Sequence, residues 1–176
     1  MKIITNKEEA LIQIKKNVLN TRFISKKLKN DKDVVLAAVT QSGCGYFLQY
    51  ASQQLKKNKE VVLTAVQQSG LALQYASKEI RNNKEVVLAA VQEYVGALEY
   101  ASDTLKNDKE VVLTAVQQDG STLKFASKEL KDSIGINNPI SRLKELIQIE
   151  QDKINLESKI VTQNKITHNI IKVIKI

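Results

Sequence analysis

Apolar and polar positions alternate along this chain in a pattern that returns about every 25 residues. The clearest copy spans 58–82 and reads NKEVVLTAVQQSGLALQYASKEIRN, and related copies follow at 83–107 and 108–132. An upstream copy at 31–57 has two extra residues, and 6–30 matches the pattern more loosely. A fixed period of this length is typical of repeat architectures, in which each unit packs against its neighbours. The sequence therefore predicts five units in series.

Each unit begins with an amphipathic segment, for which 60–68 is the model. At 100° per residue, Val62, Ala65 and Val66 fall on one side of a helix, and Glu60 and Gln67 fall on the other. A strand is the alternative, because a Val-Val pair is favoured in sheets. The segment does not alternate strictly between apolar and polar residues, so the pattern favours a helix.

The residues beside each segment indicate where it starts and ends. Asn82 with Glu85, and Asn107 with Glu110, resemble a reciprocal capping arrangement at a helix start. A glycine follows the segment in most units and predicts a tight turn with glycine in the left-handed conformation, at Gly45, Gly70 and Gly120.

A second helix is expected over about 71–81. Leu73, Ala76 and Ile80 lie on one of its faces, and Leu71 and Tyr75 lie on an adjoining one. A helix that is apolar on two faces needs two neighbours, and the second must come from the next unit. One aromatic residue recurs in each unit and predicts a packing ladder between units, with a stacking row for bases or a peptide as the alternative: Phe23, Tyr50, Tyr75, Tyr100 and Phe125.

The repeats end near residue 132, and a turn-rich linker is expected at 133–138. Pro139 suits the first turn of a new helix over 139–176, capped by Asn138. This helix either caps the array or self-associates as a homodimer through 140–165, since apolar residues recur every seven positions at Ile140, Ile147, Ile154 and Val161. The tail IIKVIKI fits either a short strand or a helix end.

The fold class predicted is therefore all-α. An α-solenoid-like array of stacked helical hairpins covers 6–132, with the linker and the long C-terminal helix after it. Aromatic residues are 5% of the chain, so its core must be built from Val, Leu, Ile and Ala.

Charge is distributed unevenly along the chain. The net charge is +8, but residues 1–30 carry 8 basic and 2 acidic side chains, and residues 31–138 carry 12 and 13. A protein that followed a nucleic-acid backbone along its repeats would show the opposite distribution. Binding of nucleic acid or another anionic surface is thus an alternative confined to the first unit, through Lys15, Lys16, Arg22, Lys26, Lys27 and Lys29.

Chemistry-bearing residues are scarce. Cys44 is the single cysteine and His168 the single histidine, in different segments, so neither a disulfide within the chain nor a catalytic pair is expected. Phosphate-binding glycine motifs and zinc-protease motifs are absent. We expect no enzymatic activity, no cofactor and no metal. The lone thiol and the absence of a signal peptide or an 18-residue apolar run indicate a cytoplasmic, reducing location and no membrane span, with a host cell included if the protein is secreted or viral.

The unit [ND]-K-E-V-V-L-x-A-V-Q-x-x-G-x-x-L-x-[YF]-A-S-x-x-L-[KR]-[ND] resembles the repeat of the domain of unknown function 4116 family. The segment 108–132 matches it throughout, 31–132 matches well, and 6–30 matches weakly. The resemblance implies an α-helical repeat module, and it carries no activity and no functional residues to transfer.

The function expected is a non-enzymatic scaffold for protein interaction, with a partner that the sequence does not identify. Stacked units keep a repeating core while their surfaces vary, so a partner would contact the variable positions. The positions that we select for this surface lie near the turns: Gln67, Gln68, Gln92, Tyr94, Gln117 and Gln118.

Overall fold

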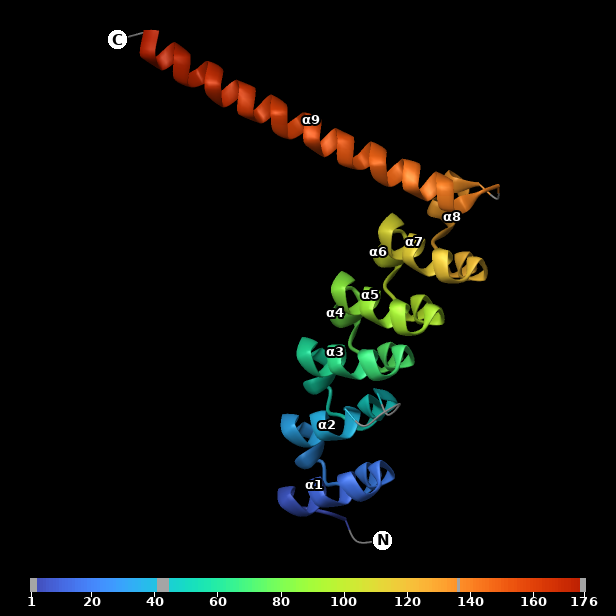
Figure 1. Cartoon of the computed structure of the whole chain (residues 1–176). Helices are drawn as coiled ribbons and strands as arrows, with labels where there is room; N and C mark the ends of the chain where they lie inside the picture. Colours follow the sequence, from blue (N-terminus) through green and yellow to red (C-terminus); the bar gives the residue numbers. More distant parts are fainter. Residues whose placement is uncertain (1–2, 41–44, 136, 175–176) are drawn as a thin grey trace. The chain divides into compact units, whose positions relative to one another are not determined.

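The structure is a computed structural model that describes residues 3–40, 45–135 and 137–174 (Figure 1). Its elements, with η denoting a 3₁₀ helix, follow in the order α1 Lys7–Lys16, η1 Val18–Phe23, η2 Leu28–Asn30, α2 Lys32–Val39, η3 Gly45–Tyr50, η4 Leu55–Lys57, α3 Lys59–Gln68, η5 Gly70–Tyr75, α4 Lys78–Arg81, α5 Lys84–Glu93, η6 Val95–Tyr100, α6 Asp103–Lys106, α7 Lys109–Gln118, η7 Gly120–Phe125, α8 Lys128–Ile134 and α9 Pro139–Ile174.

No strand occurs in the described ranges, where Ile4 and Ile24 form one isolated parallel bridge. The predicted all-α repeat arrangement with a long C-terminal helix is confirmed. The chain divides into two compact units, residues 1–133 and 134–176, and each is described by itself.

The first unit is a series of like modules. Each module contributes an α-helix of eight to ten residues, a six-residue 3₁₀ helix and a short last helical turn. The α-helices pack in the order α1, α2, α3, α5 and α7, and the 3₁₀ helices pack in the order η1, η3, η5, η6 and η7 (Figure 1). Every module thus contacts the ones before and after it, as a solenoid requires.

The first helix of each module buries the face that the sequence indicates. In α3, Val62, Ala65 and Val66 are fully buried, and Val61 joins them, while Gln67 is exposed. Burying one such valine stabilises the fold by about 1.5 kcal/mol or more. The apolar face that gives the helix its position is therefore also its main source of stability.

The predicted caps are wrong by one residue. The residue that caps α5 is Asn83, whose side chain accepts the Val86 N–H at 3.2 Å, and the residue that caps α7 is Asp108. Glu85 does not close a reciprocal capping box, because its carboxylate contacts Lys59 of the preceding module at 2.6 Å. The acid at the start of each helix is used between modules instead.

The second helix predicted over 71–81 is also wrong, because it is broken in the middle. A 3₁₀ helix ends at Tyr75, Ala76 and Ser77 are extended, and the short helix α4 then begins. The Ser77 N–H donates to the carbonyl of Lys56 in the preceding module at 3.0 Å. Because the Ser77 N–H donates to another module, it cannot donate to a carbonyl of its own helix. The contact between modules therefore also breaks the helix.

The left-handed glycine turns are not present. Among the described residues, positive φ occurs at Gly135 and Asn138, in the segment before α9. Gly45 and Gly70 are instead close-approach positions, because a β-carbon on Gly45 would lie 2.0 Å from the carbonyl oxygen of Ala65 in the next module. The absence of a side chain lets neighbouring modules come together.

The five recurring aromatic rings are half-buried: Phe23, Tyr50, Tyr75, Tyr100 and Phe125. The Lys29 ammonium lies over the Tyr50 ring of the next module, 5.9 Å from its centroid. The Tyr50 ring thus lies at a module interface, and all five rings keep part of their surface exposed.

The second unit is dominated by α9, which begins at Pro139 as the sequence predicts and is continuous to Ile174, so the tail is helical that far. The Asn138 side chain accepts the Ser141 N–H at 3.4 Å as an N-terminal cap. Leu143 is fully buried, whereas the described side chains from residue 148 to residue 165 are exposed.

Candidate interaction surfaces

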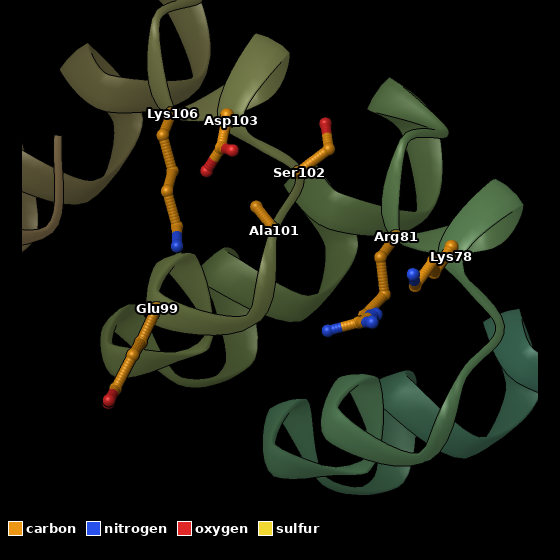
Figure 2. Close-up of a pocket in the computed structure, with 7 residues that line it drawn as sticks. All are labelled: Lys78, Arg81, Glu99, Ala101, Ser102, Asp103 and Lys106. Carbon is orange, nitrogen blue, oxygen red and sulfur yellow. The ribbon is translucent and has the colours of Figure 1, made fainter. Parts of the chain in front are cut away.

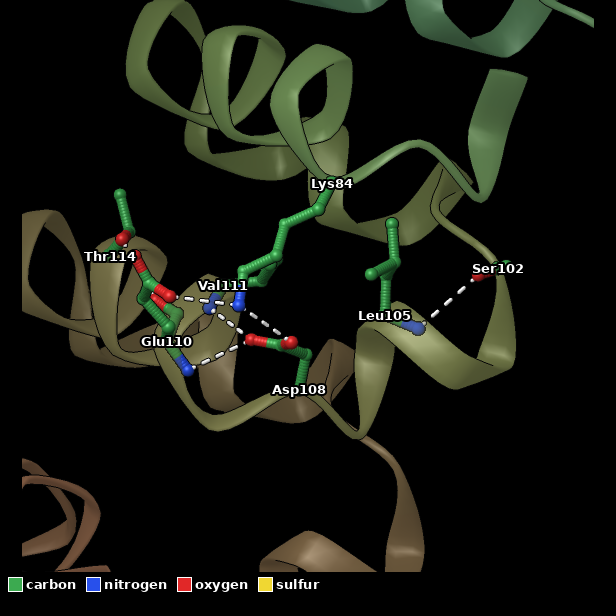
Figure 3. A network of polar contacts seen from close by, with 7 residues as sticks. All are labelled: Lys84, Ser102, Leu105, Asp108, Glu110, Val111 and Thr114. Atoms are coloured by element: carbon green, nitrogen blue, oxygen red, sulfur yellow. Dashed lines mark hydrogen bonds and ion pairs between the residues drawn. The ribbon is translucent and has the colours of Figure 1, made fainter. Parts of the chain in front are cut away.

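A ladder of ion pairs joins successive modules. The lysine at the second position of each module reaches the acid at the third position of the next, in the pairs Lys7–Asp33 at 2.6 Å, Lys32–Glu60 at 2.5 Å, Lys59–Glu85 at 2.6 Å and Lys84–Glu110 at 2.8 Å. Figure 3 shows the last of these, where the Lys84 ammonium also contacts Asp108 at 2.8 Å. These acids are committed to module contacts and form no acid–base pair.

The ladder shifts the protonation of its members. Hydrogen bonds to Asp33 and then Asp31 raise the pKa of Lys7 above its ordinary value. Burial alone would lower the pKa of Lys84, but its hydrogen bonds to Asp108 and Glu110 outweigh burial and the pKa is raised. Both ammonium groups are therefore held in the charged form, which is the form that the ladder needs.

A second ladder is built on the serine that lies two residues after the end of each 3₁₀ helix from η3 on, leaving out the short η4. Ser102 N–H donates to the Arg81 carbonyl of the preceding module at 2.9 Å, and the Ser102 hydroxyl donates to Asn82 Oδ1 at 2.6 Å. The same hydroxyl accepts the Leu105 N–H at 3.2 Å, as Figure 3 shows. Equivalent backbone bonds start at Ser52, Ser77 and Ser127. The recurring serines thus bond one module to the next.

One exposed apolar side chain per module lies at the start of four successive 3₁₀ helices. Three occupy the same position of their modules, namely Leu19, Tyr46 and Leu71, with exposed fractions of 45%, 36% and 38%. In the fourth module this position is Gly96, and the ring of Tyr94 fills its place, since a β-carbon on Gly96 would lie 2.5 Å from that ring. Tyr94 is 47% exposed. We call Leu19, Tyr46, Leu71 and Tyr94 the apolar row.

The glutamines selected from the sequence lie beside this row. Gln67 and Gln68 end α3, Gln92 is the penultimate residue of α5, and Gln117 and Gln118 end α7. All except the half-buried Gln68 are exposed, and Gln118 donates to the Val91 carbonyl of the preceding module at 3.4 Å. The structure thus places the six selected residues, Tyr94 included, at equivalent ends of successive helices.

The basic residues of the first module are not brought together. Lys15 and Lys16 end α1, whereas Lys26, Lys27 and Lys29 lie in the last segment of the module, just before α2 begins. The ten residues of α1 separate the two ends of a module by about 15 Å. Arg22 lies in η1 with its guanidinium over the Phe23 ring, 5.1 Å from the centroid.

Polar grooves run between the last segments of adjacent modules. The groove in Figure 2, of about 400 Å³, is lined by Lys78, Arg81, Glu99, Ala101, Ser102, Asp103 and Lys106. The Nε of Arg81 is buried there without a hydrogen-bond partner. Cations and carboxylates are mixed along the groove, and no nucleophile is paired with a base.

Two regularities escaped the sequence reasoning. Of the apolar row, Tyr94 alone was selected from the sequence; Leu19, Tyr46 and Leu71 hold the second position of their 3₁₀ helices, but their exposure cannot be read from one sequence. A basic residue also occupies the next-to-last position of every module, at Lys29, Lys56, Arg81, Lys106 and Lys131. The Lys56 ammonium donates to its own module's Gln49 carbonyl at 2.8 Å, and burial lowers the pKa of Lys56.

The described residues contain no group of three or more His, Cys, Asp or Glu side chains that could hold a metal ion. In the same part of the chain, no helix has both the length and the hydropathy needed to cross a membrane. Cys44 and the side chain of His168 lie outside the described residues.

The stacked modules, their ladders and their exposed row define a helical-repeat protein. The family model for Domain of unknown function (DUF4116) matches residues 6–56, 42–81 and 83–131. These matches cover more than half of the chain, which therefore belongs to the DUF4116 family. No curated protein and no solved structure matches the chain.

Proposed function

We propose that this chain is a non-enzymatic scaffold that binds a protein partner along the apolar row. The observation that supports this proposal is the register of Leu19, Tyr46, Leu71 and Tyr94, one per module in four successive modules. Single exposed apolar residues are ordinary on a protein surface. Four such residues at equivalent places in successive modules instead form a line of contact points for a partner. The line continues through the fourth module because the Tyr94 ring occupies the space beside Gly96.

The partner that suits this row is a peptide segment with apolar side chains at the module spacing. Packed helices lie about 8–10 Å apart, so the anchors recur at about that distance. Tyrosine combines a large apolar ring with a polar end and is enriched in interfaces. Beside the anchors, the amides of Gln67, Gln92 and Gln117 supply donors and acceptors for the backbone of the segment. A reducing, cytoplasmic location is part of the same proposal.

Selection of displayed random peptides on the immobilised chain tests the proposal. We expect enriched sequences with two or more apolar residues, whose affinity falls at least about tenfold for the double variant Leu71→Ser, Tyr94→Ser. The matched control is Ile12→Ser, because Ile12 is 53% exposed on α1 and lies outside the row. Circular dichroism of each variant checks that the fold is retained.

The proposal fails if no peptide is enriched over an unrelated helical protein. It fails equally if the enriched peptides bind the double variant as tightly as they bind the parent chain.

Nucleic-acid binding by the first module is the second candidate, and the observation in its favour is the net charge of residues 1–30. The separation of Lys15 and Lys16 from Lys26, Lys27 and Lys29 at opposite ends of the module weakens this candidate. A phosphate backbone would have to pass both ends to neutralise the full set.

A further inference from the structure

Helix α9 exposes large apolar side chains along much of its length. The described residues from 148 to 165 are all exposed, and among them are Ile149 at 60%, Ile154 at 56%, Leu156 at 59%, Ile160 at 51% and Val161 at 53%. Most helical stability in proteins comes from packing an apolar face and not from intrinsic propensity. A 36-residue helix with this surface therefore calls for a partner helix.

The apolar residues of α9 fall into two stripes, of which Leu146 and Ile147 at the start are half-buried and the later apolar members are exposed. The stripe expected from the sequence contains Ile147, Ile154 and Val161, but the positions that would complete its seam are Glu150 and Glu157. The other stripe alternates steps of three and four residues, as a coiled-coil seam requires, through Leu146, Ile149, Lys153, Leu156 and Ile160. These five positions fall within about 80° around the helix. We call them the α9 seam.

We propose that the α9 seam pairs with the α9 seam of a second copy of this chain in antiparallel orientation. The pairing places Ile149 against Ile160 of the second copy, and Lys153 against Leu156. A single lysine within an apolar seam costs stability and restricts the register and the oligomeric state. Four of the five seam positions are thus self-complementary in one arrangement, and Leu146 faces Gln163 at the end of the pair.

Charges beside the seam decide the orientation. In a parallel pair, Glu145 would face Glu150 of the second copy and Asp152 would face Glu157, so every charged pair at the flanks would be repulsive. In the antiparallel pair, Asp152 faces Lys159 of the second copy on one side of the seam. This attraction offsets the repulsion between Glu150 and Glu157 on the other side. Like charges placed together disfavour the parallel arrangement.

Engineered disulfides test the orientation in the full chain, with Cys44→Ser as the background. A mixture of the Ile149→Cys and Ile160→Cys chains, under mild oxidation, is expected to give a crosslinked pair of one chain of each kind. Each variant alone is expected to stay uncrosslinked, because antiparallel pairing holds like positions apart. Crosslinking of Ile149→Cys with itself overturns the proposal, since a parallel pair brings these residues together.

The oligomeric state gives a second test. Light scattering of the parent chain is expected to give the mass of two chains, and Leu156→Asp is expected to weaken association at least about 100-fold by placing a charge in the seam. Gln151→Asp is the matched control, because it adds the same charge on the opposite side of α9 and is expected to leave association unchanged. A monomeric parent, or equal effects of the two substitutions, overturns the proposal.

Discussion

A β-carbon built on Gly70 would lie 2.3 Å from the carbonyl oxygen of Ala90, one module further along the chain. No real β-carbon makes so short a contact with a backbone atom, so the two modules approach as closely as this residue type allows. Gly120 is the equivalent glycine of the last module, and nothing lies within 4 Å of its β-carbon position. The glycine is thus a requirement of the interface and not of the turn.

Gly70→Ala is therefore expected to destabilise the array. Overpacking against a backbone that cannot yield costs about 3 kcal/mol, at the upper end of the usual range. Urea denaturation followed by circular dichroism measures the change. Gly120→Ala is the control. It is expected to stabilise the fold by about 0.5 kcal/mol, because alanine lowers the conformational entropy of the unfolded chain. Equal effects of the two substitutions would contradict a role for Gly70 in module contact.

Removing one serine of the second ladder should loosen a single module junction. Ser102→Ala deletes both the cap of α6 and the donor to Asn82, and we expect a loss of about 1 kcal/mol in the free energy of unfolding. Thr104→Ala, an exposed position two residues further on, is expected to change stability by less than about 0.5 kcal/mol. Hydrogen exchange of the backbone N–H of residue 102 should be faster in the Ser102→Ala variant than in the parent chain, and unchanged in the Thr104→Ala variant.

Alkaline pH should weaken the ion-pair ladder. The pKa of Lys84 is raised in the folded chain, so its contribution is fully present below the ordinary lysine value of 10.5 and is lost as pH rises through the folded value. We expect Lys84→Met to cost about 0.5 kcal/mol at neutral pH, a modest figure because the side chain is 41% exposed. Above the folded pKa the two chains should be equally stable.

Salt supplies the control for this prediction. The difference between the parent chain and Lys84→Met should shrink at about 1 M salt, where charges on exposed groups are screened within about 3 Å. A difference that persists at high pH and at high salt would show that the Lys84 stem contributes by packing and not by charge.

Nucleic-acid binding is expected to be undetectable. The cations of the first module lie at two ends of α1, so few of them can contact one phosphate backbone together. Fluorescence anisotropy with labelled mixed-sequence DNA and RNA at about 50 mM salt measures this, since the electrostatic contribution is large at low salt. Binding that weakens steeply with added salt, and that is lost in a Lys15→Gln, Lys16→Gln variant, would revive the second candidate.

Periodicity alone was sufficient to predict the stacked modules and the buried face of α3, because both follow from apolar spacing within a short window. The break at Ala76 and Ser77 could not be predicted in the same way, since the carbonyl that holds it belongs to Lys56 in another module. The role of Gly70 depends likewise on Ala90. Of the apolar row, Tyr94 was selected from the sequence, whereas Leu19, Tyr46 and Leu71 were not, because exposure is a property of the assembled array.

Each bond of the two ladders joins a residue to one that lies 20 to 28 positions away. No rung of either ladder skips a module, so a whole module can be removed while each remaining rung still meets the equivalent residue of the next module. Excising 83–107 would bring Lys59 to Glu110 and Arg81 to Ser127 in the pairings that Glu85 and Ser102 now complete. The length of the array can therefore change only in steps of one whole module, while the spacing between neighbouring modules stays fixed.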